Sequence, residues 1–264
     1  MVWSDFNLKR YSGYARPVLV LTVLVLFAAW RCEVSIGDLV TGFRKGLGML
    51  DLFFPPDWSA FARMIQPALA TVAVAAIATP IGAACAILVG LAGARNVAPP
   101  WLRLTTRSLM ALERGVPEIV LLLVLVAAFG MGPFAGVAAL VVGSIGMLGK
   151  LIADAIEDID ARTVDSVECV GATRAQVIRY GVLPQVLPSI VANTMFRFEV
   201  NIRASVLLGA VGAGGIGYEL STAMSQLEYR KATVAAIVSL ALVFLAERGS
   251  DALRSRVIGA ERLL

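Results

Sequence analysis

Histidine is absent from this sequence, and cysteine occurs only three times in 264 residues. Cys32, Cys85 and Cys169 lie far apart and share no spacing typical of metal ligands. A zinc or haem site and a disulfide framework are therefore not predicted. The sequence also lacks the pattern G-x-x-x-x-G-K-[ST], so the chain cannot hold the phosphates of a nucleotide in that type of loop.

Charged residues are scarce as well. They make up 16% of the chain, whereas hydrophobic residues make up 58% and the mean hydropathy is +0.81. Because soluble domains are only about half apolar, this composition indicates a protein of the lipid bilayer. The net charge of +4 could indicate nucleic-acid binding, but the basic residues are confined to short segments between apolar runs, which is the pattern of membrane topology.

Six apolar runs predict an all-α integral membrane protein with about six transmembrane helices. These runs are residues 17–30, 61–91, 116–129, 134–148, 190–208 and 232–246. The first run follows basic residues as in a signal peptide, but no small-residue cleavage site follows it, so an uncleaved span is predicted. Between the first two runs, apolar residues at helical spacing precede Pro55 and Pro56, which predicts an amphipathic helix at the membrane interface. Residues 93–113 are predicted to form a basic connection with a helix that lies on the membrane surface or is partly embedded in it.

The distribution of lysine and arginine predicts the orientation. Six spans place both termini on one side, together with residues 94–114 and 150–187. That side holds fifteen of the 23 basic residues, against six on the opposite side and two within the run 190–208. By the positive-inside rule, both termini and residues 150–188 are cytoplasmic. We therefore expect residues 1–60 to form an N-terminal tail, the first span and an extracytoplasmic amphipathic segment, and residues 61–264 to form the core transmembrane domain.

The longest polar stretch is residues 150–188. Its first half is predicted to be helical because valines recur on one face, at Val164, Val167 and Val170. Gly171 is predicted to break that helix, and a second short helix begins at Thr173, because Thr173 and Gln176 have the spacing of a capping box. Two prolines are predicted to end the second helix, at Pro184 and Pro188. This pattern suits a segment that docks into a partner; a linker without a partner and a DNA-binding helix-turn-helix are alternatives, the latter disfavoured by the flanking apolar runs.

These residues resemble the cytoplasmic motif of type I ABC importer permeases. That motif reads EAA, three residues, Gly, nine residues, Ile, one residue, Leu-Pro. Its positions here are residues 165–167 (DSV), Gly171, Gly181 and residues 183–184 (LP), with the spacing kept. Asp165 stands where Glu is usual, and Gly181 stands where Ile is usual.

The resemblance is closer to the phosphonate-transport branch of these permeases, over residues 53–246. The segments that carry it are FPPDW (54–58), VPE (116–118), GMGPFAGV (130–137), GATR (171–174), VIRYGVLPQVLP (177–188), RFEVN (197–201) and VGAGGIG (211–217). It implies a MetI-like permease fold with cytoplasmic EAA coupling helices, in a homodimer that docks two ATP-binding cassette ATPase subunits. ATP and Mg²⁺ would bind to those subunits, no cofactor would bind to this chain, and an extracytoplasmic substrate-binding protein would deliver the cargo.

The function implied is that of a cell-membrane permease subunit, not an enzyme, which imports phosphonate or a related phosphorus oxyanion such as phosphite or phosphate. One alternative is a permease for another small solute, such as an amino acid. A remote alternative is a membrane enzyme acting on lipid phosphates. The absence of histidine argues against that enzyme, because it would need nucleophiles, metal ligands or a histidine base.

Three sets of residues are predicted to carry the function. The ATPase-coupling residues are Asp165, Gly171, Ala172, Thr173, Arg174, Leu183 and Pro184. The substrate-pathway residues are Asn193, Arg197, Glu199, Asn201 and Arg203, because charges in a span are costly unless they face protein or water. The residues of a gate or tight turn are Gly212, Gly214, Gly215 and Gly217.

Within the charged run, two interpretations stay open. Arg197 or Arg203 could neutralise an anionic substrate, since a guanidinium matches phosphonate or phosphate oxygens in a fork. Alternatively, Glu199 and Arg203 could form a structural ion pair, because they are four residues apart on a helix. Glu118, at the start of an apolar run, is expected to lie at the membrane interface without a chemical role.

Overall fold

The computed structural model describes the backbone of residues 8–33 and 35–261. The chain divides into two compact units, residues 1–52 and 53–264. The regular structure in the described residues is helical.

The first unit contains α1 (Leu8–Arg31) and most of α2 (Ile36–Phe53). The apolar part of α1 coincides with the first predicted span. The helix predicted before the two prolines is confirmed as α2, which ends just before Pro55 and Pro56.

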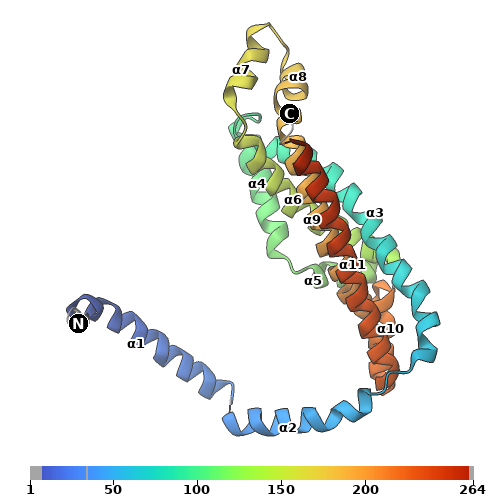
Figure 1. Cartoon of the computed structure of the whole chain (residues 1–264). Helices are drawn as coiled ribbons and strands as arrows, with labels where there is room; N and C mark the ends of the chain where they lie inside the picture. Colours follow the sequence, from blue (N-terminus) through green and yellow to red (C-terminus); the bar gives the residue numbers. More distant parts are fainter. Residues whose placement is uncertain (1–7, 34, 262–264) are drawn as a thin grey trace, which may run out of the picture. The chain divides into compact units, whose positions relative to one another are not determined.

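The second unit begins with a single 3-10 turn, Trp58–Ala60, and continues as a helix bundle (Figure 1). Its helices are α3 (Phe61–Gly93), α4 (Pro100–Gly115), α5 (Glu118–Phe129), α6 (Pro133–Glu157), α7 (Ala161–Cys169), α8 (Arg174–Val177), α9 (Leu183–Leu208), α10 (Ile216–Ser225) and α11 (Tyr229–Glu261). Two π-helical turns, Ile178–Val182 and Gly209–Ala213, join α8 to α9 and extend the end of α9.

Each of the six predicted spans falls on an apolar helix. Trp58–Gly93, Pro133–Glu157 and Tyr229–Ser255 are long and apolar enough to cross a membrane. A fourth span results if the bent pair Arg174–Ala213 and Ile216–Ser225 is taken as one. The remaining two predicted spans correspond to the shorter apolar helices Pro17–Arg31 and Glu118–Phe129.

Helices α3 and α6 run parallel and pack closely through small residues. Gly82 faces Ser144, and Gly90 faces Ile152 eight residues further along both helices. A side chain at either glycine would collide with the facing residue of α6. Small residues let helix backbones approach in a membrane, where the hydrophobic effect does not drive helices together.

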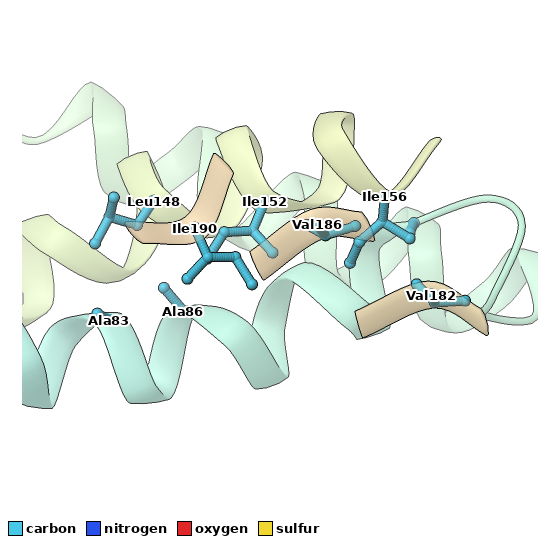
Figure 2. Close-up of a cluster of buried hydrophobic side chains, with 9 residues drawn as sticks. Ala83, Ala86, Leu148, Ile152, Ile156, Val182, Val186 and Ile190 are labelled. Atoms are coloured by element: carbon cyan, nitrogen blue, oxygen red, sulfur yellow. The ribbon is translucent and has the colours of Figure 1, made fainter. Parts of the chain in front are cut away.

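An apolar cluster packs the start of α9 against the C-terminal parts of α3 and α6 (Figure 2). The labelled members are Ala83 and Ala86 of α3, Leu148, Ile152 and Ile156 of α6, and Val182, Val186 and Ile190 at the start of α9. Every one of these side chains is buried. A close-packed apolar core therefore joins the start of α9 to α6 and α3.

Residues 93–129 contain two helices, α4 in the predicted basic connection and α5 in the predicted span. The two helices follow each other antiparallel to α6. Met110 of α4 lies against Gly149, Glu113 against Gly146, and Glu118 of α5 against Gly143. The helix breaks between α4 and α5 because Pro117 disfavours helical backbone at Val116, whose ψ is 119°.

The polar stretch 150–188 differs in part from the structure that the sequence predicted. Its first residues continue α6 to Glu157, and a separate helix, α7, begins after Asp160, whose side chain accepts the Arg162 backbone N–H at 3.0 Å. The break at Gly171 is confirmed, with a φ of +79°, and so is the capping box of Thr173 and Gln176.

The prediction that Pro184 and Pro188 end the second helix was wrong. Pro184 lies in the first turn of α9, where the missing N–H needs no partner, and Pro188 lies in its second turn, within the helix. α8 therefore passes into α9 through the π-helical turn, without an intervening loop.

Candidate functional site

A buried polar cluster lies halfway along the helix bundle. Its centre is Arg197 of α9, whose side chain is only 4% exposed. Ser144, near the middle of the 25-residue α6, lies beside it. A charge at this depth must be compensated by protein groups or by water.

Three neighbours hold the guanidinium group of Arg197. Its Nη2 donates to Glu118 Oε1 at 2.7 Å and forms an ion pair with that carboxylate. Its Nε donates to Ser144 Oγ at 3.0 Å, and Nη1 approaches Met147 Sδ at 3.3 Å, where the thioether is a weak acceptor. The ion pair thus ties α9 to the first residue of α5 across α6.

Asn201, one turn further along α9, extends the cluster to α3. Its Nδ2 donates to Thr79 Oγ1 at 2.9 Å and to Ser144 Oγ at 3.2 Å. Asn201 is fully buried, and its Oδ1 has no hydrogen-bond partner in the described part of the chain. Ser144 and Thr79 in turn donate to backbone carbonyls of their own helices, so α3, α6 and α9 are joined at one level.

Two glycines of α6 leave room for two carboxylates. A Cβ at Gly143 would lie 2.9 Å from Glu118 Oε1 and 3.1 Å from Arg197 Nη2. A Cβ at Gly146 would collide with the carboxylate of Glu113, the last acidic residue of α4. Since residues three apart on a helix are about 5–6 Å apart at Cβ, the carboxylates of Glu113 and Glu118 lie near each other beside Arg197.

The discontinuity between α4 and α5 explains why Glu118 reaches this depth. α5 has 12 residues, a length of about 18 Å, so its N-terminus ends partway along α6 rather than at the bundle end. Glu118 is the first residue of α5, where a carboxylate is favoured by the helix dipole. Sequence reasoning assigned it no role. A usable signal was that Glu118 and Arg197 are opposite charges in different apolar runs, each of which needs compensation.

The remaining predicted pathway residues lie around this cluster with different partners. Glu199 does not pair with Arg203; it contacts Arg254 of α11 at 3.3 Å. Arg203 is exposed on the surface of the single chain. Asn193 donates to Ser189 Oγ at 3.2 Å, one turn earlier on α9. The ion pair between Glu199 and Arg254 therefore joins α9 to α11, and the two helices pack side by side.

The predicted coupling residues gather at one end of the bundle, where α7 and α8 project beyond the other helices (Figure 1). Asp165, Gly171, Thr173 and Arg174 are exposed, and Ala172 is half-buried at the elbow. Leu183 and Pro184 lie at the start of α9 instead.

Contacts at the base of this projection fix it to α9 and to the 94–99 connection. Gln185 Oε1 accepts the backbone N–H of Asp160 at 3.1 Å. A cavity of about 160 Å³ is lined by Val97, Val164 and Val177, among others. Of the three valines predicted to share one face, Val164 and Val167 pack here, whereas Val170 lies beyond the end of α7 and is 82% exposed.

Basic residues of another segment lie at the same end. Arg107 of α4 contacts Glu157, the last residue of α6, at 2.8 Å, and Arg95 contacts the same carboxylate at 3.4 Å. The two polar segments that the charge count placed on one side of the membrane are therefore neighbours in the fold.

The glycine-rich segment forms a bend of 54° between α9 and α10 rather than a simple turn. Gly212, Gly214 and Gly215 have positive φ angles, which favour glycine. Gly217 is buried where α10 crosses α9, and a Cβ there would collide with the Val206 carbonyl. The bend is tied to two other segments: Ile216 N–H donates to Thr71 Oγ1 at 2.9 Å, and Gly132 N–H donates to Gly212 O at 2.9 Å.

Comparison with known protein families gives a match to the model described as binding-protein-dependent transport system inner membrane component, over residues 82–259. Among curated proteins, the chain is 40% identical over 222 residues to the phosphate-import permease protein PhnE of Mycolicibacterium smegmatis. That match covers 83% of this chain but only 42% of the relative. The chain is also 35% identical to the putative phosphite transport system permease protein HtxC of Stutzerimonas stutzeri, over 96% of this chain and 90% of the relative.

Among solved structures, the chain is similar to the inward-facing MetNI methionine ABC transporter. The TM-score is 0.64 and the identity is 21%, over 74% of this chain and 95% of that chain. This likeness shows the MetI-like permease fold, which the sequence analysis predicted.

Proposed function

Because the chain belongs to the family of binding-protein-dependent transport system inner membrane components, we propose that it forms the translocation pathway of an importer for a small phosphorus oxyanion, namely phosphonate, phosphite or phosphate. A component of such a system works with a binding protein and with ATPase subunits. The chain is a transport subunit and not an enzyme, so ATP and Mg²⁺ are expected on the ATPase partner.

The main support for a phosphorus oxyanion as the substrate is Arg197. It places a buried guanidinium at mid-depth of the bundle, where a small oxyanion would have to pass. A guanidinium pairs with phosphorus oxyanions through directed N–H bonds and is less strongly hydrated than an ammonium group. The relatives named for phosphate and phosphite transport support the same class.

The assembly proposed is a homodimer with one ATPase docked on each copy. The end of the bundle that carries α7 and α8 would face the cytoplasm together with both termini, and α10 would lie at the extracytoplasmic end near the binding protein. ATP-driven closure of the ATPases would displace α7 and α8. Since α8 continues directly into α9, this displacement would move the helix that carries Arg197 and alternate the access to it.

Uptake of ³²P-phosphate into proteoliposomes tests this proposal, with the binding protein and ATPase supplied. We expect Arg197→Ala and Arg203→Ala to reduce uptake at least 10-fold, while ATPase assembly on the permease stays intact. Arg248→Ala serves as a control, because Arg248 lies over the exposed Phe244 ring on α11 and outside the cluster. Undiminished uptake in both variants would reject a role for these arginines.

The alternative cargo is an amino acid or another small solute. The fold shared with a methionine transporter does not distinguish the two, because 21% identity reports the fold alone. Calorimetry of the cognate binding protein against phosphonate, phosphite, phosphate and methionine separates them. Heat release with methionine and none with the phosphorus oxyanions would favour the alternative.

A further inference from the structure

We propose that Glu118 is a built-in counter-ion that occupies the anion site of Arg197, and that the transported oxyanion must displace this carboxylate. The inference rests on the proposed function, since it concerns how the same site selects its cargo. Glu118 then acts as a specificity-determining residue of the pathway, in addition to Arg197.

The hydrogen bonds of Arg197 leave capacity for a second anion. A guanidinium has five N–H groups, and in the described part of the chain Arg197 uses three, one of them toward a sulfur atom. Glu118 is engaged through a single oxygen, Oε1, rather than in a two-pronged pair. A tetrahedral oxyanion can accept from Nη1 and Nη2 together, a geometry that phosphate groups share with carboxylates.

Within the ion pair, Glu118 is the partner that lies nearer the chain surface. The Arg197 side chain is 4% exposed, whereas that of Glu118 is 33% exposed. An anion that approaches from the exposed side of the pair therefore meets the carboxylate first. Because a partly exposed carboxylate at this depth is costly in contact with lipid, that side is expected to face water or a second copy of the chain.

Charge balance makes the exchange selective. A buried guanidinium that loses its partner is strongly destabilised, so Arg197 needs an anion at every stage. Glu118 supplies that anion when no substrate is present, and an oxyanion can replace it without leaving the charge uncompensated. A neutral solute cannot, because it would leave the buried Arg197 charge without a counter-ion.

The local backbone allows Glu118 to leave and return. It is the first residue of α5, directly after the break at Val116 and Pro117, so its position is not fixed by a preceding helical turn. Its carboxylate rests in the space left by Gly143, which has no side chain to hold it there. The N-terminus of α5 stabilises the carboxylate after it leaves the guanidinium.

Equilibrium binding of ³²P-phosphate to the purified permease–ATPase complex, without the binding protein, tests the exchange. Glu118→Gln keeps the shape of the side chain and an oxygen that can accept from Arg197, but it removes the competing charge. We expect it to bind phosphate at least 10-fold tighter than the unaltered complex. The double variant Glu118→Gln with Arg197→Gln is expected to lose that gain.

A second variant acts without changing any charge. Gly143→Ala introduces a Cβ close to both Glu118 Oε1 and Arg197 Nη2, so it should weaken the ion pair and tighten phosphate binding in the same direction. Glu228→Gln is the matched control, because it also removes one carboxylate of an ion pair, with Lys231, far from Arg197 in the chain.

If Glu118→Gln binds phosphate with unchanged affinity, the proposed exchange is wrong. If that variant does not assemble, unchanged affinity in Gly143→Ala leads to the same conclusion. Equal tightening in Glu228→Gln overturns the exchange too, because the effect would then be general. Uptake by the unaltered transporter tests the proposed function separately from the exchange. If phosphate, phosphite and phosphonate all fail to enter proteoliposomes, the substrate class itself is wrong.

Discussion

Arg197 is held by groups from two other helices, α5 and α6, so its environment depends on side chains that no local pattern connects. Its partner Glu118 is 79 positions away, and Ser144 is 53 positions away. The sequence predicted that a charge in an apolar run needs compensation, and this expectation is met by the ion pair. It did not predict which residue compensates it, and Glu118 was expected to have no chemical role.

Ser144 provides a test of the cluster at the level of one hydroxyl group. Ser144→Ala removes the acceptor of both Arg197 Nε and Asn201 Nδ2, so we expect a loss of about 1.5–3 kcal/mol in the free energy of unfolding, typical of hydrogen bonds to charged groups. The measurement is thermal or denaturant unfolding of the purified protein in detergent.

Ser239→Ala is the matched control for that measurement. Ser239 is also buried in a helix, but its hydroxyl donates only to the Ala235 carbonyl of the same helix. Its removal is expected to change stability by less than about 0.5 kcal/mol, since the carbonyl keeps its backbone partner. Equal losses in the two variants would show that Ser144 does not hold the cluster together.

At the scale of elements, the helix pair α7 and α8 was predicted more accurately than the helix α4. The glycine elbow and the capping box are local devices, so residues 171–176 carry enough information to specify them. The course of α4 along α6 depends on contacts such as Glu113 against Gly146, which join positions far apart in the chain. The sequence did not predict that α9 continues past Pro188. A proline near the start of a helix destabilises it less than a proline in its interior, so Pro188 does not end α9.

We predict that the projecting α7–α8 pair contacts the ATPase. In a variant without the native exposed Cys169, a cysteine introduced at Ala172 is expected to crosslink to a co-expressed ATPase subunit, because residue 172 lies in the elbow between α7 and α8. A cysteine at Met224, on α10 at the other end of the bundle, should form no such crosslink. Absence of crosslinks at Ala172 and its neighbours would count against docking.

At the scale of the whole molecule, the second unit has two distinct ends. One carries α7, α8 and the basic connection before α4, and the other carries α10 and the bend at Gly212 to Gly215 (Figure 1). The charge count predicted that residues 94–114 and 150–187 share a side, and the ion pairs of Arg95 and Arg107 with Glu157 place these segments together. Which end faces the cytoplasm stays a prediction.

Labelling of intact cells with a membrane-impermeant maleimide measures that orientation. In a variant without Cys32, a cysteine at Met131, which is 78% exposed, is expected to react in intact cells, because it lies on the predicted extracytoplasmic side. The native Cys169 should react only after the membrane is permeabilised. The reverse pattern would invert the topology and contradict the positive-inside assignment.

The sequence by itself determined the membrane class, the six apolar runs, the docking motif and the family, since these depend on composition and on spacing within short segments. Only the tertiary structure decided that Glu118 is the partner of Arg197. The reason is that α5 begins at mid-depth after the break at Pro117, and Gly143 of α6 leaves room for the Glu118 carboxylate. Both effects act only when α5 and α9 pack on α6. A site built across three helices is therefore specified by their packing, and not by any one segment.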